Sequence, residues 1–240
     1  MTISLAALNL NSGFNVFDRT HIIWLVSILL ITMIGSIAYN SFSHRQRKVT
    51  KYVIAYSLLV FEIIKITVVI NEDKNILYYL PIHLCGLAIF LLIIYAHTQN
   101  RYVAEILYAI TLPGAAIALI TPGWANEKLL SFLHVHSFIF HMVIIMFPLM
   151  IIVSKEHKPS LRALIAPVSF LAVTVPAVYI FNKWTGTNYM FLNWPISNTP
   201  IMTLANWFGE PGYIFGMILV LIVVWILMYI KELGNLIVKK

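Results

Sequence analysis

The sequence predicts an all-α, polytopic membrane protein whose single domain is a bundle of seven transmembrane helices. Three observations lead to this fold class. Of the 240 residues, 60% are hydrophobic and only 10% are charged, which is more apolar than a soluble domain of this size. The apolar residues gather in runs of about 20, the length that a helix needs to cross about 30 Å of hydrocarbon. Polar or charged segments interrupt these runs.

The first four spans are apolar runs bounded by polar segments. "FNVFDRTH" precedes the first, the basic segment "SHRQRKVTK" separates it from the second, and shorter polar segments bound the third and fourth. Their expected bounds are 20–39, 52–70, 76–96 and 103–121.

The last three spans follow the same rule, with expected bounds 132–153, 163–181 and 213–230. Between the final two lies the longest connection, the outer loop 182–212, which is rich in Trp, Asn, Thr, Pro and Gly. Its aromatic residues favour the membrane interface, so we expect it to cover the outer mouth of the bundle. No repeat or linker divides the chain, and residues 1–240 are expected to form one domain.

The basic residues predict the orientation. Eleven Lys and Arg residues fall in the first, third and fifth loops and the C-terminal tail, against four in the N-terminal segment and the other loops. The positive-inside rule therefore predicts an external N-terminus and a cytoplasmic C-terminus. The net charge of +7 then reflects topology and contact with anionic lipid, so we expect no nucleic-acid partner. The N-terminus lacks the basic region and cleavage site of a signal peptide.

The span 52–70 contains two ionisable residues, Glu62 and Lys65, in "VFEIIKITV". Each costs about 2.5–3.5 kcal/mol near the bilayer centre on insertion scales, so each needs a reason to be there. The two lie three positions apart on one helix face and can pair. Such a pair either holds helices together or belongs to a polar site.

The span 132–153 begins with "FLHVHSFIFHMV", which has three histidines within eight residues. His134, Ser137 and His141 follow helical spacing and are expected to form one polar stripe, whereas His136 is rotated away from it. A single buried histidine is often a structural one. A stripe instead favours a cavity or binding site.

The rise of a helix places several of these groups at one depth. Glu62 is expected roughly 12 Å below the outer edge and His141 roughly 13 Å, because each residue advances a helix by 1.5 Å. Cys85, in "LPIHLCGLAIF", reaches a similar depth if its span begins at residue 76. His83 lies just above this layer. A site in the outer half of the membrane is therefore predicted.

Cys85 is the only cysteine, so it forms no disulfide within the chain. A buried thiol without a partner is inert, while a neighbouring imidazole converts it into a nucleophile. His83 is two positions away and points about 200° around the helix from Cys85, which makes it a poor partner. The span that carries His141 is the expected source of the base. The other interpretation is a buried cysteine that serves as a small hydrophobic residue.

The order of several motifs resembles the YwaF-like family of bacterial integral membrane proteins. The motifs are "FNVFDRTH", "LPIHLCGL", "LPG" then "TPG", "FLHVHSFIFHMV", "TGTNYMFLNWP" and "WFGEPGYI", spread over residues 14–215. This family is distantly similar to the eukaryotic transmembrane protein 164 acyltransferases. The resemblance implies a location in the bacterial cytoplasmic membrane, phospholipid partners and acyl transfer through a cysteine assisted by a histidine. His141 best matches that histidine; the eukaryotic cysteine directly precedes a histidine, where this chain has Ile82.

The resulting hypothesis is an acyltransferase that acts on a phospholipid or lipid-linked substrate from the outer leaflet. Cys85 would attack the ester carbonyl and His141 would act as general base and acid. His83 or Lys65 would stabilise the oxyanion or a phosphate head group. The remaining candidate substrate-binding residues are Glu62, His134, His136, Ser137 and, in the outer loop, Asn188.

Three alternatives stay open at the level of sequence. A lipid esterase would use the histidines without a covalent cysteine step. A non-enzymatic seven-helix protein would bind or transport a ligand at the same polar layer. A metal site would take nitrogens from the histidines, but no H-E-x-x-H or C-x-x-C spacing supports one, so we expect no metal and no cofactor. The sequence does not indicate any protein partner.

Overall fold

The structure is a computed structural model that describes residues 13–197 and 199–238. The described residues form helices joined by loops and turns, without strands. In chain order the elements are α1 (Arg19–Asn40), α2 (His44–Asn71), η1 (Ile76–Tyr78), α3 (Leu84–Thr98), α4 (Arg101–Ile106), η2 (Leu107–Thr111), α5 (Leu112–Ile120), α6 (Phe132–Val153), η3 (Leu161–Leu164), α7 (Ile165–Thr185), η4 (Tyr189–Phe191), α8 (Pro200–Phe208), α9 (Tyr213–Met228) and α10 (Ile230–Val238).

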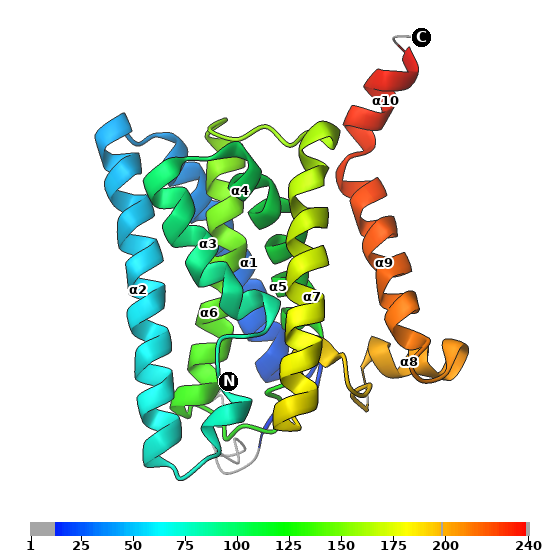
Figure 1. Cartoon of the computed structure of the whole chain (residues 1–240). Helices are drawn as coiled ribbons and strands as arrows, with labels where there is room; N and C mark the ends of the chain where they lie inside the picture. Colours follow the sequence, from blue (N-terminus) through cyan, green and yellow to red (C-terminus); the bar gives the residue numbers. More distant parts are fainter. Residues whose placement is uncertain (1–12, 198, 239–240) are drawn as a thin grey trace, which may run out of the picture.

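Five helical stretches within the described residues are long and apolar enough to cross a membrane. They are Arg19–Asn40, His44–Asn71, Arg101–Ile120, Phe132–Val153 and Leu161–Thr185. Two more of the predicted spans are shorter apolar helices, α3 with 15 residues and α9 with 16. Figure 1 shows all seven stretches running along a common direction, with α8 lying across one end. The chain is therefore a multi-pass membrane protein.

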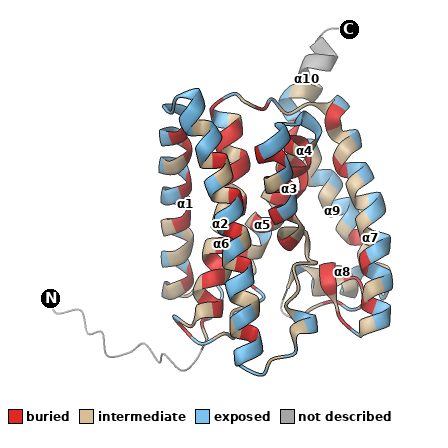
Figure 2. Cartoon of the chain, turned by 60° about the vertical axis from the view of Figure 1, so that its left-hand side comes forward, coloured by how far each residue is buried: buried red, intermediate tan, exposed pale blue. Residues whose placement is uncertain are grey.

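The helix α6 lies at the centre of the bundle. It packs against α1, α2 and α5, and α3 packs against α2. Buried residues face these contacts, while exposed residues cover the outward faces of the helices (Figure 2). Many exposed residues are large and aliphatic, for example Leu29, Ile34 and Val173. Such a surface suits hydrocarbon rather than water.

Polar caps decide where three long helices begin. Asp18 Oδ1 accepts from the His21 N–H at 2.8 Å, and Ser131 Oγ accepts from the His134 N–H at 3.3 Å. Ser43 and Gln46 form a reciprocal capping box at the start of α2. The apolar run predicts a span from residue 52, but the capping box starts α2 within the basic segment.

The predicted span 76–96 is α-helical only from Leu84. Pro81 lacks an N–H and disfavours helical geometry at Leu80, so the chain makes the short helix η1 and a turn before α3 begins. The turn is closed by a 2.8 Å hydrogen bond from the Ile82 N–H to the Leu80 carbonyl. This late start places His83 at the N-cap of α3.

The predicted span 103–121 contains a π-helical turn, η2, between α4 and α5. Pro113 follows it and has no N–H to donate to the carbonyl of Ala109, four residues earlier. The indole Nε1–H of Trp225 donates to that carbonyl instead, at 2.8 Å. Tyr108 also donates to the Met228 carbonyl at 3.0 Å. These two bonds fasten α9 to the π-helical turn η2.

Two buried polar networks lie at one end of the bundle. We call it the basic end, because it carries the Lys and Arg residues of 44–51 and 155–162. Glu156 accepts from Tyr39 at 2.9 Å and from Lys51 at 2.6 Å, and the Lys51 side chain is only 2% exposed. Glu105, fully buried, accepts from the Tyr229 hydroxyl, and its Oε2 lies 3.0 Å from His157 Nε2. The second network links Tyr229, just before α10, to Glu105 of α4.

Candidate functional site

A carboxylate, an ammonium group and an imidazole meet between α2 and α6. Lys65 Nζ donates to Glu62 Oε1 within one helix face. His136 Nε2 lies 3.6 Å from Glu62 Oε2, and the two side chains are 4% and 6% exposed. This separation is longer than a hydrogen bond, and the two groups form an ion pair only when the imidazole is protonated. His136, which the helical wheel rotates away from the stripe, is therefore the histidine that faces the predicted Glu62–Lys65 pair.

His141 lies one turn further along α6 and has one nitrogen fixed. Its Nδ1 lies 2.7 Å from the backbone carbonyl of Ser137, and its ring stacks on the indole of Trp124 at 4.8 Å between centroids. A carbonyl only accepts, so Nδ1 carries the proton of the neutral ring. Nε2 consequently has a free lone pair, and no hydrogen bond to Nε2 occurs among the described residues.

His83 has the opposite arrangement. Its Nδ1 accepts a hydrogen bond of 3.1 Å from the backbone N–H of Met190, and its ring contacts those of Tyr189 and Phe191. A backbone N–H only donates, so the proton of the neutral ring is on Nε2. His83 thus offers a hydrogen-bond donor, whereas His141 offers an acceptor.

These side chains share one region, which we call the polar cluster and define as Glu62, Lys65, His83, His136 and His141. A positive charge on Lys65, or on His141 if it were protonated, would act on His83. His136 lies equally within electrostatic range of Lys65 and His141. The cluster joins α2, α6 and the start of α3 at the end of the bundle opposite to the basic end. Its buried polar groups stand in otherwise apolar surroundings, where electrostatic interactions are strong.

The outer loop holds His83 in place. Asn182, fully buried near the end of α7, donates to the Tyr189 carbonyl at 2.8 Å and accepts from the Tyr189 N–H at 2.9 Å. The Tyr189 hydroxyl donates to the Leu77 carbonyl at 2.6 Å and accepts from the Leu80 N–H at 2.9 Å. Burial raises the pKa of Tyr189 to about 12, so the hydroxyl stays protonated and can make both bonds at neutral pH. These bonds hold the outer loop against the segment that precedes α3, next to His83.

Cys85 lies in the first turn of α3, two residues after His83. It is a free thiol, partly buried and packed against the main hydrophobic core beside Leu84. No hydrogen bond joins its sulfur to another side chain in the described part of the chain. The first turn of a helix carries a partial positive charge that stabilises an adjacent anion.

Three of the predicted substrate-binding residues use their polar atoms elsewhere. His134 Nε2 accepts from Trp24 Nε1 at 3.1 Å, in an aromatic group with Phe14 and Phe138. The Ser137 hydroxyl donates to the Leu133 carbonyl at 2.8 Å within α6. The Asn188 side chain accepts from the Asn193 N–H and donates to the Trp194 carbonyl. Both bonds lie within the outer loop. The structure does not bring these three into the polar cluster.

Residues that the sequence does not single out complete the site. Trp124 covers one face of His141, and its Nε1–H is buried without a partner among the described residues. Asn182 and Tyr189 position His83 from the outer loop. The polar run "TGTNYMFLNWP" is the signal that could indicate Tyr189, and Asn182 lies three residues before it. No comparable signal marks Trp124, because an aromatic residue beside Pro and Gly is typical of any interfacial turn.

Within residues 13–197 and 199–238, no group of three His, Cys, Asp or Glu side chains is arranged to hold a metal ion. The polar cluster offers one carboxylate and three imidazoles, but Lys65 already pairs with the carboxylate. The arrangement instead combines a fixed base and a fixed donor, with a thiol two residues after the donor. This set can serve nucleophilic chemistry on an ester.

Comparison with known proteins gives one match. The TMEM164 family matches residues 16–229, which includes the polar cluster, Cys85, the outer loop and all of α9. No curated protein and no solved structure matches the chain significantly. The match supports the resemblance to transmembrane protein 164, while it leaves the YwaF-like bacterial assignment a prediction. Because the match covers most of the sequence, the chain belongs to the TMEM164 family.

Proposed function

We propose that this protein is a membrane-embedded acyltransferase that moves a fatty acyl chain between lipid esters at the polar cluster. The observation that carries the proposal is the pair of histidines with opposite proton positions, His141 as acceptor and His83 as donor. Acyl transfer needs both, a base for the nucleophile and a donor for the oxyanion. Cys85 lies two residues from the donor, and family membership agrees with the proposal.

The first half-reaction forms a thioester. His141 Nε2 takes the proton of the Cys85 thiol, and the sulfur attacks the carbonyl carbon of the lipid ester. The carbonyl electron pair moves to oxygen, where the Nε2–H of His83 stabilises the negative charge. Collapse of this intermediate breaks the ester C–O bond, and the departing alkoxide takes the proton from His141. The lysolipid leaves and the acyl group remains on Cys85.

The second half-reaction reverses these steps on another acceptor. His141 removes the proton of the acceptor hydroxyl, and the resulting oxygen attacks the thioester carbon. The C–S bond breaks, the sulfur regains its proton from His141, and the new ester is released. Lys65, with one of its three donor positions occupied by Glu62, can hold the phosphate of a phospholipid.

A second candidate is a histidine-based lipid esterase. The absence of a hydrogen bond between Cys85 and the histidines of the described chain favours it. In this mechanism His141 activates a hydroxyl or water directly, and the acyl group never resides on the enzyme. The role of His83 is the same in both mechanisms.

The proposal also includes the topology. Seven spans, with α3 and α9 as the two shorter ones, would place the polar cluster in the outer half of a bacterial cytoplasmic membrane. The bias of Lys and Arg toward the basic end supports a cytoplasmic location for that end. Acyl chains would then reach the site sideways from the outer leaflet.

The proposal is tested by reconstitution. The purified protein is incorporated into vesicles with a phospholipid whose acyl chain is isotopically labelled and an unlabelled lysophospholipid, and the label is followed by mass spectrometry. We expect the label to move to the lysophospholipid. If wild-type protein with verified folding moves no acyl group from any of several phospholipid classes, the proposed function is wrong.

A further inference from the structure

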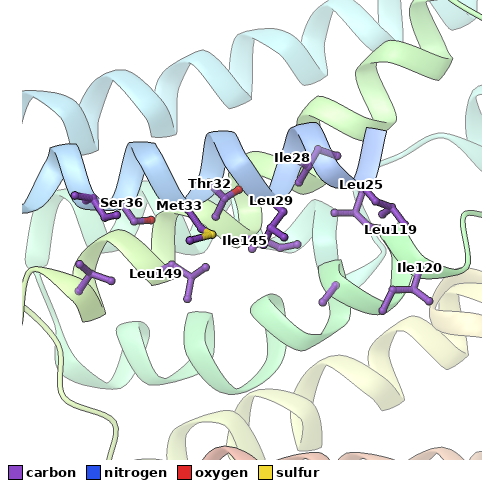
Figure 3. A pocket seen from close by; sticks show the side chains of 13 residues that line it. Leu25, Ile28, Leu29, Thr32, Met33, Ser36, Leu119, Ile120, Ile145 and Leu149 are labelled. Carbon is purple, nitrogen blue, oxygen red and sulfur yellow. The ribbon is translucent and has the colours of Figure 1, made fainter. Parts of the chain in front are cut away.

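A long apolar groove runs along the bundle where α1, α5 and α6 meet (Figure 3). Its volume is about 430 Å³. Figure 3 shows Leu25 and Ile120 at one end and Ser36 and Leu149 towards the other. Residues of α1 line its whole length, α6 lines it through Ile145, Leu149 and Val153, and α5 contributes residues near Leu119. The only lining hydroxyls are those of Thr32 and Ser36.

The α6 side of the groove continues the helix surface that carries His141. Residues 141, 145, 149 and 153 follow one another at intervals of four, so their side chains lie along one slowly turning face. Ile145 lies one turn from His141 and is the first of them to line the groove. One end of the groove therefore adjoins the proposed catalytic base.

Trp124 and Leu119 connect the two regions from the side of α5. Trp124 stacks on His141 and packs with Leu119 and Ile145 in one hydrophobic cluster. Leu119 and Ile145 are also groove residues. The orphaned Nε1–H of Trp124 is thus a buried hydrogen-bond donor between an apolar groove and a general base. An ester carbonyl is a group that would accept from it.

The surroundings indicate what fills the groove. Leu29, Met33 and Val153 line it and are 59%, 52% and 42% exposed, so the groove opens sideways to the medium around the helices. In a chain that crosses a membrane, that medium is lipid hydrocarbon. The lining has no charge to hold a head group. A long aliphatic chain matches this apolar, elongated lining.

The groove also has the length of a long fatty acyl chain. From His141 to Val153, α6 advances by roughly 18 Å at 1.5 Å per residue. A chain with its carbonyl beside His141 would extend past Ile145 and Leu149 and end near Ser36 or Val153. The groove would then limit chain length at the basic end.

We infer that this groove is the acyl-chain site of the enzyme, which holds the chain while the Nε1–H of Trp124 donates to the ester carbonyl beside His141. The inference rests on the proposed function for the role of His141. It adds the place in the bundle that the acyl chain occupies. It also assigns a residue, Trp124, that positions the carbonyl.

Photo-crosslinking tests this without requiring turnover. Two phospholipid probes carry a diazirine, one at the end of a long acyl chain and one next to the carbonyl, and both are incorporated into vesicles of phosphatidylethanolamine and phosphatidylglycerol with the protein. We expect the chain-end probe to label α1 and α6 near Ser36 and Val153. The carbonyl probe should label the vicinity of Trp124. His141→Ala should give the same labelling, because the groove does not depend on catalysis.

A matched pair of α1 variants supplies the control. Met33→Trp fills the groove and should reduce chain-end labelling near Ser36 several-fold, and it should shift the acyl transfer profile toward shorter chains. Ile34→Trp places the same indole on the next residue, which is 66% exposed and does not line the groove, and should change neither. If labelling spreads evenly over the lipid-facing residues of α1, α2 and α7, the groove inference is wrong. If the groove is labelled as expected but no acyl transfer occurs, the proposed function is wrong and the chain-binding groove is supported.

Discussion

His141 and His83 present ring nitrogens of opposite character to one region of the bundle. The carbonyl of Ser137 fixes the proton of His141 on Nδ1, and the N–H of Met190 fixes that of His83 on Nε2. Two backbone groups from different elements thus set the two tautomers before any substrate binds. Such preorganisation lowers the cost of stabilising charge during a reaction.

Replacement of His141 tests the base. His141→Ala should reduce the rate of acyl transfer by about 100- to 10,000-fold, the range of general acid–base catalysis. Ser137→Ala is the matched control, because it removes a hydroxyl that binds only the Leu133 carbonyl and keeps the backbone carbonyl that orients His141. Rates are measured with labelled phospholipid in vesicles. Equal rates for wild type and His141→Ala would exclude His141 as the base.

Replacement of His83 tests the donor. His83→Phe keeps an aromatic ring against Tyr189 and Phe191 but removes the Nε2–H, and the maximal rate should fall by about 100- to 1,000-fold, as for loss of an oxyanion donor. The apparent affinity for lipid should change far less. A variant with reduced affinity and an unchanged maximal rate would show that His83 binds the substrate and does not stabilise the transition state.

Tyr189→Phe tests the hydrogen bonds that hold the outer loop against the segment before α3. The change removes the donor to the Leu77 carbonyl and leaves the Leu80 N–H without its acceptor. An unsatisfied buried group costs about 1–3 kcal/mol, so the melting temperature in detergent should fall. Limited proteolysis should also cut the loop 186–199 faster. Protection equal to that of wild type would mean that the hydroxyl does not hold the loop.

The network at the basic end predicts a contrast between single and double variants. Glu156→Leu leaves the buried ammonium group of Lys51 without its carboxylate, and loss of one partner of a buried pair costs about 3–5 kcal/mol. Lys51→Met combined with Glu156→Leu removes both charges and should recover part of the lost thermal stability. A double variant less stable than the Glu156 variant would show that Lys51 does not depend on this pair.

Much of the fold follows from the sequence because hydropathy acts along the chain. The predicted span 132–153 coincides with α6, and 20–39 differs from α1 by one residue at each end. The start of α3 is predicted too early, because apolar residues 76–83 meet the requirement for hydrophobicity while Pro81 prevents a continuous helix. The count of seven spans and the orientation remain predictions.

The site is less predictable, because it depends on how helices rotate against one another. Depth along each helix places Glu62 and the histidines of α6 together, but the face that α6 turns to α2 depends on packing. That packing selects His136 as the neighbour of Glu62 and turns His134 toward Trp24. The hydrogen bonds from Tyr189 to Leu77 and Leu80 and from Met190 to His83 span more than 100 residues of sequence, and no local pattern encodes them.

The thioester mechanism requires that Cys85 carries the acyl group. Intact-protein mass spectrometry after brief incubation with phospholipid, at a time when turnover is incomplete, measures this. We expect an added mass equal to one acyl chain, mapped to Cys85 and released by neutral hydroxylamine. The adduct should be absent from Cys85→Ala and strongly reduced in His141→Ala. Acyl transfer at the wild-type rate by Cys85→Ala, with no adduct on the wild-type protein, would contradict the thioester mechanism.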